Sequence, residues 1–496
     1  MAKAIMIQGT ASNAGKSLLC AGLCRIFAQD GYRVAPFKSQ NMALNSAITA
    51  EGFEIGRAQY VQAMAAGVLP SVDMNPVLLK PTSHVGSQVI VSGVPRATLS
   101  AREYYQYKKA LRPEIEAAYR RLSADNDIIV IEGAGSPAEI NLRADDFVNM
   151  GMAKIADAPV LLCGDIDRGG VFASLYGTVK LLEIEEQDRI KGLIINKFRG
   201  DVEILRPGLG TLEELTGKPV LGVVPMLQVD IDDEDSLSSR FGRGDRVGLI
   251  DIAVIRLPRI SNFTDFNPLE RMEQVSLRYV DDPRDLGAPD LVILPGTKNT
   301  LDDLKWLRQN GLEAKLLQHA GAGGALLGIC GGYQMLGEAI SDPEGVEGGG
   351  TLRGLGLLPG RTVFRGEKTR TQVEGTFTAA SGIFAGMAGT AFTGYEIHMG
   401  ETENPCPAMA LRDQTGREKT DGQSRGNVLG CYIHGLFDRG ECAKALVDCL
   451  LQARGLTAQT AAVDWNAYQE TQFNLLSDGL RRAIDMEAVY RILGTK

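Results

Sequence analysis

Between residues 3 and 224, short runs of consecutive apolar residues alternate with longer segments whose apolar residues recur at helical spacing. The clearest runs are AIMIQG, DIIVIEG, APVLLCGD and KGLIINKF. Each has the length of a strand buried on both faces, and strands that alternate with helices are typical of parallel sheets. This half of the chain is therefore predicted to be a parallel α/β domain.

A second alternating series begins after a segment that has no periodic apolar face. Residues 228–248 are acidic and then rich in Ser, Gly and Arg, which is typical of a domain boundary. The apolar runs LIDIAVIRL, DLVILPGT, GALLGICGG and NVLGCYIHGLF follow. We expect a first domain over 1–235, a second α/β domain over 249–442, and a helical extension over 443–496 that packs on the second domain.

Composition narrows the class of protein further. The formal charge of −9 disfavours nucleic acid as a partner, because such a partner needs an electropositive face. No apolar run approaches the length that spans a membrane, and the N-terminal MAKAIMIQGT has no charged leader. The eight cysteines show no paired metal-type spacing, so we expect them to be reduced. A soluble cytoplasmic protein is predicted.

A glycine-rich loop, GTASNAGKS over residues 9–17, follows the first predicted strand and precedes a helical segment. Backbone N–H groups at a helix N-terminus bind phosphate oxygens, a lysine reaches the terminal phosphates, and a serine hydroxyl ligates magnesium. Five residues rather than the standard four separate the two glycines. A glycine-rich turn without a ligand is the alternative. The candidate ATP contacts are Thr10, Asn13, Gly15, Lys16 and Ser17.

This longer loop resembles that of the dethiobiotin synthetase-like P-loop group, whose members use ATP to activate carboxyl groups. The resemblance implies that Glu132, at the end of DIIVIEG, joins Ser17 in holding Mg²⁺. It also implies that Asn196, at the end of a later strand, contacts the nucleobase. The alternative role of Glu132 is to cap the following turn.

Charged residues follow two neighbouring strands of this half. Asp165, Asp167 and Arg168 come directly after APVLLCG, and Lys197 and Arg199 follow Asn196. Ligands of open α/β sheets bind at the carboxyl ends of the strands, so the density of charge here favours a functional role. For the two basic residues, an ordinary surface loop is the alternative.

Four segments resemble the cobyric acid synthases of the cobalamin pathway in particular. They are PFKSQNMALNS, MNPVLLKP, EGAGSPAEINL and DIDRGGVFAS. In the first of them, Lys38 lies just beyond a predicted strand, where its ammonium can neutralise charge on a transferring phosphoryl group. A solvated loop lysine is the alternative.

The segment GALLGICGGYQMLG predicts a buried strand, a sharp turn with Cys330 at its apex, and a helix. This is a nucleophile elbow with sulfur in place of oxygen. The helix N-terminus lowers the pKa of the thiol, and the Gly331 N–H can donate to an oxyanion. Upstream, LPGTKNT resembles the class I glutamine amidotransferase loop that completes the oxyanion hole, which makes Gly296 the second candidate. A buried, inert cysteine is the alternative.

His434, in GCYIHGLF, is the predicted base, because members of the family use this histidine to activate the thiol. His398, in GYEIHMGET, is its competitor, and we assign it no catalytic step. Many class I glutaminases carry an acid two residues beyond the histidine, where this chain has Leu436. The third member of the triad is therefore missing or supplied from elsewhere, a departure that is usual among cobyric acid and cobyrinic acid diamide synthases.

The resemblance covers nearly the whole chain and implies a ligase that amidates the b, d, e and g carboxylates of adenosylcobyrinic acid a,c-diamide. It implies Mg²⁺ as cofactor and the corrinoid, ATP and glutamine as small-molecule partners. Cobyrinic acid a,c-diamide synthase is the nearest alternative, and KSQNMALNS and DIDRGGVFA argue against it. A partitioning ATPase would need no Cys330 elbow, and a lipid-linked peptidoglycan amidase would not carry the dethiobiotin synthetase-like half.

Overall fold

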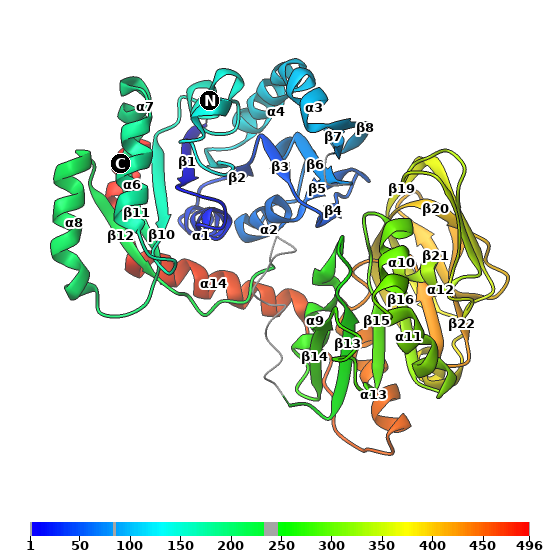
Figure 1. Cartoon of the computed structure of the whole chain (residues 1–496). Helices are drawn as coiled ribbons and strands as arrows, with labels where there is room; N and C mark the ends of the chain where they lie inside the picture. Colours follow the sequence, from blue (N-terminus) through cyan, green and yellow to red (C-terminus); the bar gives the residue numbers. More distant parts are fainter. Residues whose placement is uncertain (1, 83–85, 233–246, 496) are drawn as a thin grey trace.

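The computed structural model describes residues 2–82, 86–232 and 247–495, and each half of the chain is built on its own large sheet (Figure 1). Most of the predicted linker at 228–248, including residue 235 where the first domain was predicted to end, lies outside the described residues.

The first sheet is parallel throughout, in the order β12-β11-β10-β1-β9-β2. Its strands are β1 (Lys3–Gly9), β2 (Val34–Phe37), β9 (Ile128–Glu132), β10 (Val160–Asp165), β11 (Ile190–Phe198) and β12 (Val220–Pro225). Successive side chains of a strand point to opposite faces. Ile5 and Ile7 accordingly enter the core beside α1, whereas Met6 enters the core on the other face. The prediction of a parallel α/β fold for this half is confirmed.

Helices cover both faces of this sheet. They are α1 (Lys16–Gln29), α2 (Arg57–Ala66), α3 (Ala101–Tyr107), α4 (Arg112–Asp125), α5 (Met150–Ile155), α6 (Val171–Leu181), α7 (Ile184–Arg189) and α8 (Val202–Thr216), with the 3₁₀ turns η1 (Val72–Met74), η2 (Lys108–Leu111) and η3 (Ile140–Asp145). Asp201 caps α8 by accepting from the Glu203 N–H, and Gly217 in left-handed conformation ends it.

A small insertion after β2 was not predicted. It consists of a sheet of β3 (Gln40–Met42), β6 (Val77–Pro81), β7 (Gly86–Val91) and β8 (Val94–Ser100), and a hairpin of β4 (Ser46–Ile48) and β5 (Glu54–Gly56). Three of these strands are only three residues long, so no alternation of polar and apolar residues identifies them. The segment PFKSQNMALNS runs through this insertion.

The second sheet joins a parallel part, in the order β14-β13-β15-β16-β23, to a mainly antiparallel part in which β17 and β19 pair in parallel. The parallel strands are β13 (Ile250–Ile255), β14 (Val275–Val280), β15 (Leu291–Leu294), β16 (Ala325–Ile329) and β23 (Val428–Cys431). The others are β17 (Ala339–Asp342), β18 (Gly350–Arg353), β19 (Arg361–Phe377), β20 (Ala391–Thr402), β21 (Pro407–Asp413) and β22 (Glu418–Arg425). The second α/β domain was predicted, but its antiparallel part was not, since these strands carry many charged residues.

The helices of the second half are short. They are α9 (Asn267–Glu270), α10 (Thr300–Gln309), α11 (Leu312–Gly321), α12 (Gly331–Leu336) and α13 (Gly440–Ala453), with the 3₁₀ turns η5 (Phe263–Phe266) and η6 (Gly382–Met387). Asn299 caps α10 by accepting from the Asp302 N–H.

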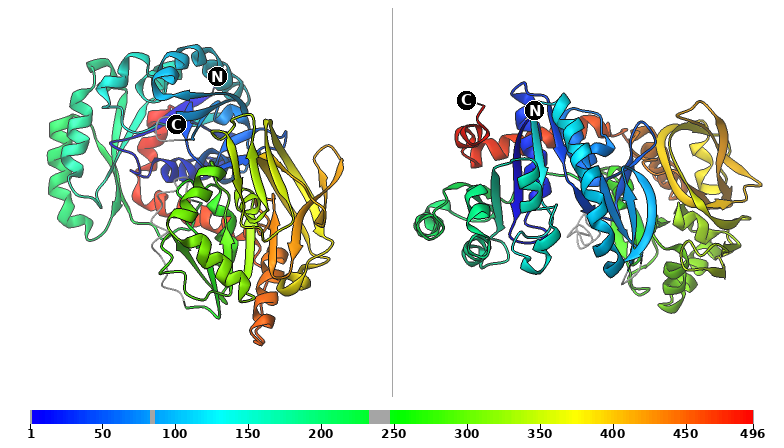
Figure 2. Two further views of the ribbon diagram at one scale, coloured as in Figure 1. Left: turned by 45° about the vertical axis from the view of Figure 1, so that its right-hand side comes forward. Right: turned by 90° about the horizontal axis from the view of Figure 1, so that it is seen from above.

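The C-terminal helices correct one prediction. We expected residues 443–496 to pack on the second domain, and α13 does so. In contrast, α14 (Trp465–Ala483) and α15 (Met486–Leu493) pack on the first sheet and on α1 (Figures 1 and 2). Leu480 lies against Gly22 of α1. A Cβ added to Gly22 would be 2.2 Å from Leu480 Cδ1. The apolar stripe of α14 correctly indicated that one face of this helix is buried. Such a stripe does not specify which element the helix packs against.

The two halves meet across buried charges. The Glu54 carboxylate of β5 accepts from Lys80, with Nζ 2.6 Å from Oε1, and from Lys368 of β19, with Nζ 2.7 Å from Oε2. Burial would raise the pKa of Glu54, but the two ammonium groups hold it well below its usual value. Removing Glu54 would leave two buried ammonium groups without their counter-charge, so this contact fixes how the halves dock.

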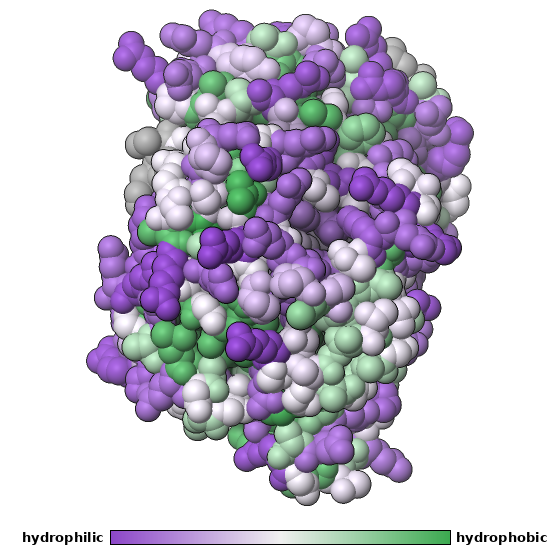
Figure 3. All heavy atoms as spheres, turned by 90° about the vertical axis from the view of Figure 1, so that its right-hand side faces the viewer, coloured by the Kyte–Doolittle hydropathy of each residue, from purple (hydrophilic) through white to green (hydrophobic). Residues whose placement is uncertain are grey.

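In the described part of the chain, no helix is long and apolar enough to cross a membrane. The face in Figure 3 carries hydrophilic residues interspersed with smaller hydrophobic groups. The cytoplasmic location stays a prediction.

Leu480→Ala should lower the free energy of unfolding of the first half by about 2–5 kcal/mol, because it removes a fully buried side chain from the contact with α1. The measurement is urea denaturation. Leu475→Ala, on the same helix but 48% exposed, is the matched control. Equal midpoints for the two variants would show that α14 does not stabilise this half.

Candidate active site

Cys330 lies at the turn between β16 and α12, with φ of 52° and ψ of −109°. Such a backbone conformation is strained for a residue with a Cβ and is characteristic of a nucleophile elbow. The turn closes because its neighbours are small: a Cβ on Gly332 would be 1.9 Å from the Leu294 carbonyl oxygen. The predicted elbow is therefore present.

His434 follows β23, and its Nδ1 lies 2.6 Å from Asp265 Oδ2. The Gly435 N–H donates to Asp265 Oδ1 at 3.0 Å, so both carboxylate oxygens are engaged. Burial would lower the pKa of His434, but the charge and hydrogen bond of Asp265, together with the Cys330 thiol, raise it to about 10. Cys330, His434 and Asp265 are all buried, and we interpret them as a candidate triad.

Asp265 is the functional residue that the sequence analysis missed. It lies in η5, in the segment SNFTDFNP that follows β13, 169 residues before His434. The only available signal was its position just after the first strand of the second series, at the carboxyl edge of the sheet. The position two residues beyond His434, where many class I glutaminases carry the acid, is occupied by Leu436, which is buried in the core.

The two predicted oxyanion residues lie next to His434 and next to the turn after β15, respectively. A Cβ on Gly296 would be 3.0 Å from His434 Cε1, and one on Gly331 would be 3.1 Å from the Thr297 backbone nitrogen. The turn after β15 is thus packed against both the histidine and the start of α12. Backbone N–H groups in this position can stabilise a negatively charged oxygen beside Cys330.

His398 lies on β20 and is engaged elsewhere. Its ring stacks on Tyr432 with centroids 3.7 Å apart, and its Nδ1 lies 2.8 Å from the Gly400 carbonyl oxygen.

The glycine-rich loop connects β1 to α1 as expected from its sequence. Gly15 precedes the helix at φ of 92°, and Asn13 has φ of 61°. The Lys16 ammonium folds over the loop and donates to the carbonyl oxygens of Ala11 at 2.9 Å and Gly135 at 3.2 Å. Burial lowers the pKa of Lys16. Thr10 closes the loop by donating its N–H to the Cys163 carbonyl oxygen at 2.9 Å.

Glu132 is the centre of the polar groups around this loop. Its Oε1 accepts from Ser17 Oγ at 2.8 Å and from Lys38 Nζ at 2.8 Å, and its Oε2 accepts from Gln62 Nε2 at 2.6 Å. Burial would raise the pKa of Glu132, but the Lys38 ammonium and these hydrogen bonds hold it below its usual value. Lys38 is thus a buried partner of Glu132 rather than a solvated loop lysine.

Asn196, on β11, supports the loop from two strands away in the sheet. Its Nδ2 donates to the Ala14 carbonyl oxygen at 2.9 Å, and a Cβ on Gly15 would lie 2.1 Å from that same nitrogen. Lys197 donates to the Asn13 carbonyl oxygen at 2.6 Å and pairs with Asp165 at 2.8 Å. The charges at the ends of β10 and β11 therefore pair across neighbouring strands, as Arg199 and Asp167 also do at 3.0 Å.

Ser17 and Glu132 form a donor set that fits a magnesium ion. A hydroxyl and a carboxylate oxygen 2.8 Å apart are both hard oxygen ligands. Among the described residues, no group of three or more His, Cys, Asp and Glu side chains could hold a metal. A cation here would therefore share its shell with the phosphates of a bound nucleotide, which is how Mg²⁺ is commonly held.

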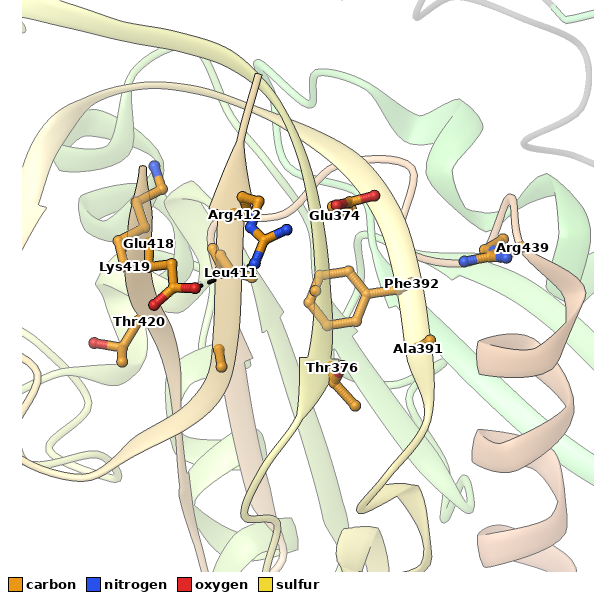
Figure 4. Close-up of a pocket in the computed structure, with 12 residues that line it drawn as sticks. Glu374, Thr376, Ala391, Phe392, Leu411, Arg412, Glu418, Lys419, Thr420 and Arg439 are labelled. Atoms are coloured by element: carbon orange, nitrogen blue, oxygen red, sulfur yellow. Dashed lines mark hydrogen bonds and ion pairs between the residues drawn. The ribbon is translucent and has the colours of Figure 1, made fainter. Parts of the chain in front are cut away.

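A hollow of about 680 Å³ lies on the antiparallel part of the second sheet (Figure 4). Strands β19 to β22 line it, together with Arg439 at the start of α13. Arg412 and Glu418 pair within it at 3.2 Å. Cys330 and His434 are not among its described lining residues, so this hollow is separate from the triad.

Two family models match the chain in succession. Residues 5–236 match the CobQ/CobB/MinD/ParA nucleotide binding domain, and residues 251–442 match the CobB/CobQ-like glutamine amidotransferase domain. The fold, the triad and the phosphate loop together define the class as a nucleotide-binding domain joined to a glutamine amidotransferase.

Relatives of known name extend over the full length. The chain is 60% identical to the cobyric acid synthase of Ruminiclostridium cellulolyticum, covering 99% of this chain and 97% of the relative. It is 54% identical to that of Lachnoclostridium phytofermentans, covering 99% of each, and 52% identical to that of Photorhabdus laumondii, covering 100% and 99%. The chain belongs to the cobyric acid synthase family. The predicted family and the predicted class of glutamine-dependent carbon–nitrogen ligase are confirmed.

Asp265→Asn should slow alkylation of Cys330 by iodoacetamide about tenfold or more at roughly pH 8. Asp265 raises the pKa of His434 to about 10 against the effect of burial, so we expect an imidazolium beside Cys330 in the native protein. Without the Asp265 charge, burial lowers the pKa of His434, so the imidazolium is lost near neutrality. The measurement is the alkylation rate between about pH 6 and 10.

Asp421→Asn is the matched control for this experiment, because it removes another buried acid of the same half, bound to the Tyr432 N–H. Asp421→Asn should not change the pH profile of Cys330 alkylation. A profile shared by native protein and Asp265→Asn would show that Asp265 does not set the pKa of His434.

Proposed function

We propose that this chain is a glutamine-hydrolysing adenosylcobyric acid synthase that amidates the b, d, e and g carboxylates of adenosylcobyrinic acid a,c-diamide. The observation that carries the proposal is the presence, in one chain, of a buried Cys–His–Asp triad and a phosphate loop backed by a buried carboxylate. The names of the full-length relatives support the corrinoid as substrate.

Glutamine hydrolysis is assigned to the triad. Cys330 attacks the carboxamide carbon, and the Gly296 and Gly331 backbone stabilises the oxyanion. His434 gives a proton to the leaving ammonia, and Asp265 holds the imidazole with Nδ1 toward the carboxylate. Water then attacks the thioester, with His434 as base, and glutamate leaves. Burial of His434 at 1% exposure keeps bulk water away from the first step.

Activation of the carboxylate is assigned to the loop in the first half. The loop N–H groups and Lys16 bind the phosphates of ATP, and Lys38 lies beside them as a second cation. Thr10 and Asn13 shape the loop, and Asn196 holds it by donating to the Ala14 carbonyl oxygen. A Mg²⁺ ion bound by Ser17 and Glu132 would neutralise phosphate charge. A corrinoid carboxylate attacks the γ-phosphorus, ADP leaves, and ammonia displaces phosphate from the resulting acyl phosphate.

Cys330→Ala should abolish amidation supported by glutamine and retain amidation supported by ammonium chloride, because only the thiol releases ammonia from glutamine. The measurement is mass spectrometry of the corrinoid after reaction of the a,c-diamide, in which each amide replaces OH by NH₂. Each amide should consume one ATP and one glutamine and release ADP and phosphate.

Cys406→Ala is the control for this experiment, since Cys406 is the exposed thiol of the same half. Glutamine-supported amidation by Cys330→Ala would remove the assigned nucleophile. If the enzyme amidates another carboxylate but not the a,c-diamide, the corrinoid is not its substrate. The assignment as a glutamine-dependent ligase would then still hold. Release of AMP and pyrophosphate would indicate adenylation instead of an acyl phosphate.

Lys16→Ala should lose amidation with either nitrogen source, because activation of the carboxylate precedes attack by ammonia. Glutamine hydrolysis should continue at its basal rate, since the triad lies in the other half. The surface variant Lys191→Ala, on β11 of the same sheet, should behave as the native protein. If Lys16→Ala amidates normally with ammonium chloride, ATP is not bound at this loop.

A further inference from the structure

The triad acid is tethered to a residue outside the triad. Asp265 donates its own backbone N–H to the Asn262 carbonyl oxygen at 3.0 Å. Asn262 begins η5 in left-handed conformation, with φ of 53° and ψ of 36°. Asparagine tolerates this region better than most residues, but the conformation needs support from its surroundings. The position of the Asp265 carboxylate therefore depends on how Asn262 is held.

Asn262 is held by the other half of the chain. Its backbone N–H donates to the Asn45 side-chain oxygen at 2.7 Å. Its Nδ2 donates to the Ser46 carbonyl oxygen at 3.2 Å. Asn45, Ser46 and Asn262 are each at most 3% exposed, so water does not substitute for these contacts.

Tyr395 links the same loop to the histidine. Its hydroxyl accepts from Asn262 Nδ2 at 2.8 Å and donates to the Ser46 carbonyl oxygen at 3.1 Å. Its ring stacks on the His434 ring with centroids 5.5 Å apart, and the two backbones exchange hydrogen bonds at 3.0 and 2.9 Å. Both partners of the Asp265–His434 hydrogen bond are thus connected to residues 45 and 46.

The Asn45–Ser46 loop is in turn anchored near the phosphate site. The Arg57 N–H, at the start of α2, donates to the Asn45 carbonyl oxygen at 3.2 Å. The same helix carries Gln62, which donates to Glu132 at 2.6 Å. On the other side, Ser46 Oγ donates to Glu54 at 2.9 Å and accepts from Lys80 at 2.7 Å. A continuous series of buried contacts therefore joins the Glu132 centre to the triad.

We propose that Asn45, Asn262 and Tyr395 are positioning residues for glutamine hydrolysis, through which the first half of the chain holds Asp265 and His434 in catalytic alignment. The inference rests on the proposed glutaminase role of Cys330. It assigns to the ALNS part of the segment PFKSQNMALNS a role in the distant glutaminase rather than in binding of ATP. Efficient hydrolysis then requires that the two halves are docked.

Asn45→Ala should lower kcat for glutamine hydrolysis about tenfold, because it removes the acceptor of one buried hydrogen bond, and should leave KM for glutamine unchanged. The pH profile of Cys330 alkylation should move toward that of Asp265→Asn. Amidation supported by ammonium chloride should stay at the native rate. Tyr395→Phe removes only the hydroxyl and keeps the ring on His434, so it should show the same pattern without loss of packing.

Arg370→Ala is the matched control, since Arg370 donates to the Gly93 carbonyl oxygen across the same interface without contacting Asn262. It should keep native glutamine hydrolysis. The proposal is overturned if Asn45→Ala and Tyr395→Phe hydrolyse glutamine as fast as Arg370→Ala, or if ammonium-supported amidation falls equally. In that case a normal response of Cys330→Ala would show that the proposed function still stands.

Discussion

The hydrogen bond between Asp265 and His434 is the interaction on which the proposed glutaminase mechanism depends, and it joins segments that are far apart in the sequence. Its acid lies just after β13, its histidine just after β23, and the loop that supports the acid comes from the first half of the chain. Because the pair is buried, a misplaced carboxylate would be costly and no water would replace it. The chemistry therefore requires the whole interface.

A comparable constraint governs the nucleotide half. Glu132 is 1% exposed and is kept ionised by Lys38, so the loop is built around a carboxylate that is already paired. The same helix α2 that supplies Gln62 to this carboxylate begins beside Asn45. Buried charges and amides, rather than apolar contacts, thus connect the two catalytic centres, with Glu54, Lys80 and Lys368 fastening the interface between them.

The sequence predicted the strongly patterned parts of this molecule and missed the parts set by tertiary contact. Runs such as DIIVIEG are buried on both faces and therefore read as strands, and the glycines around Cys330 require a tight turn. In β19, apolar and polar residues do not alternate regularly, because charged residues interrupt the pattern. Asp265 lies far from His434 in sequence, and the partner of α14 is not encoded in the stripe of α14 itself.

Cys330 is assigned as the thiol that attacks glutamine. Labelling with 6-diazo-5-oxonorleucine, a reactive analogue of glutamine, followed by peptide mass spectrometry tests this assignment directly. Cys330 is 7% exposed, whereas Cys406 is exposed. We expect an adduct on Cys330 that glutamine prevents, because binding and activation rather than exposure select the site. An adduct on Cys406, or labelling of Cys330 that glutamine does not slow, would contradict this assignment.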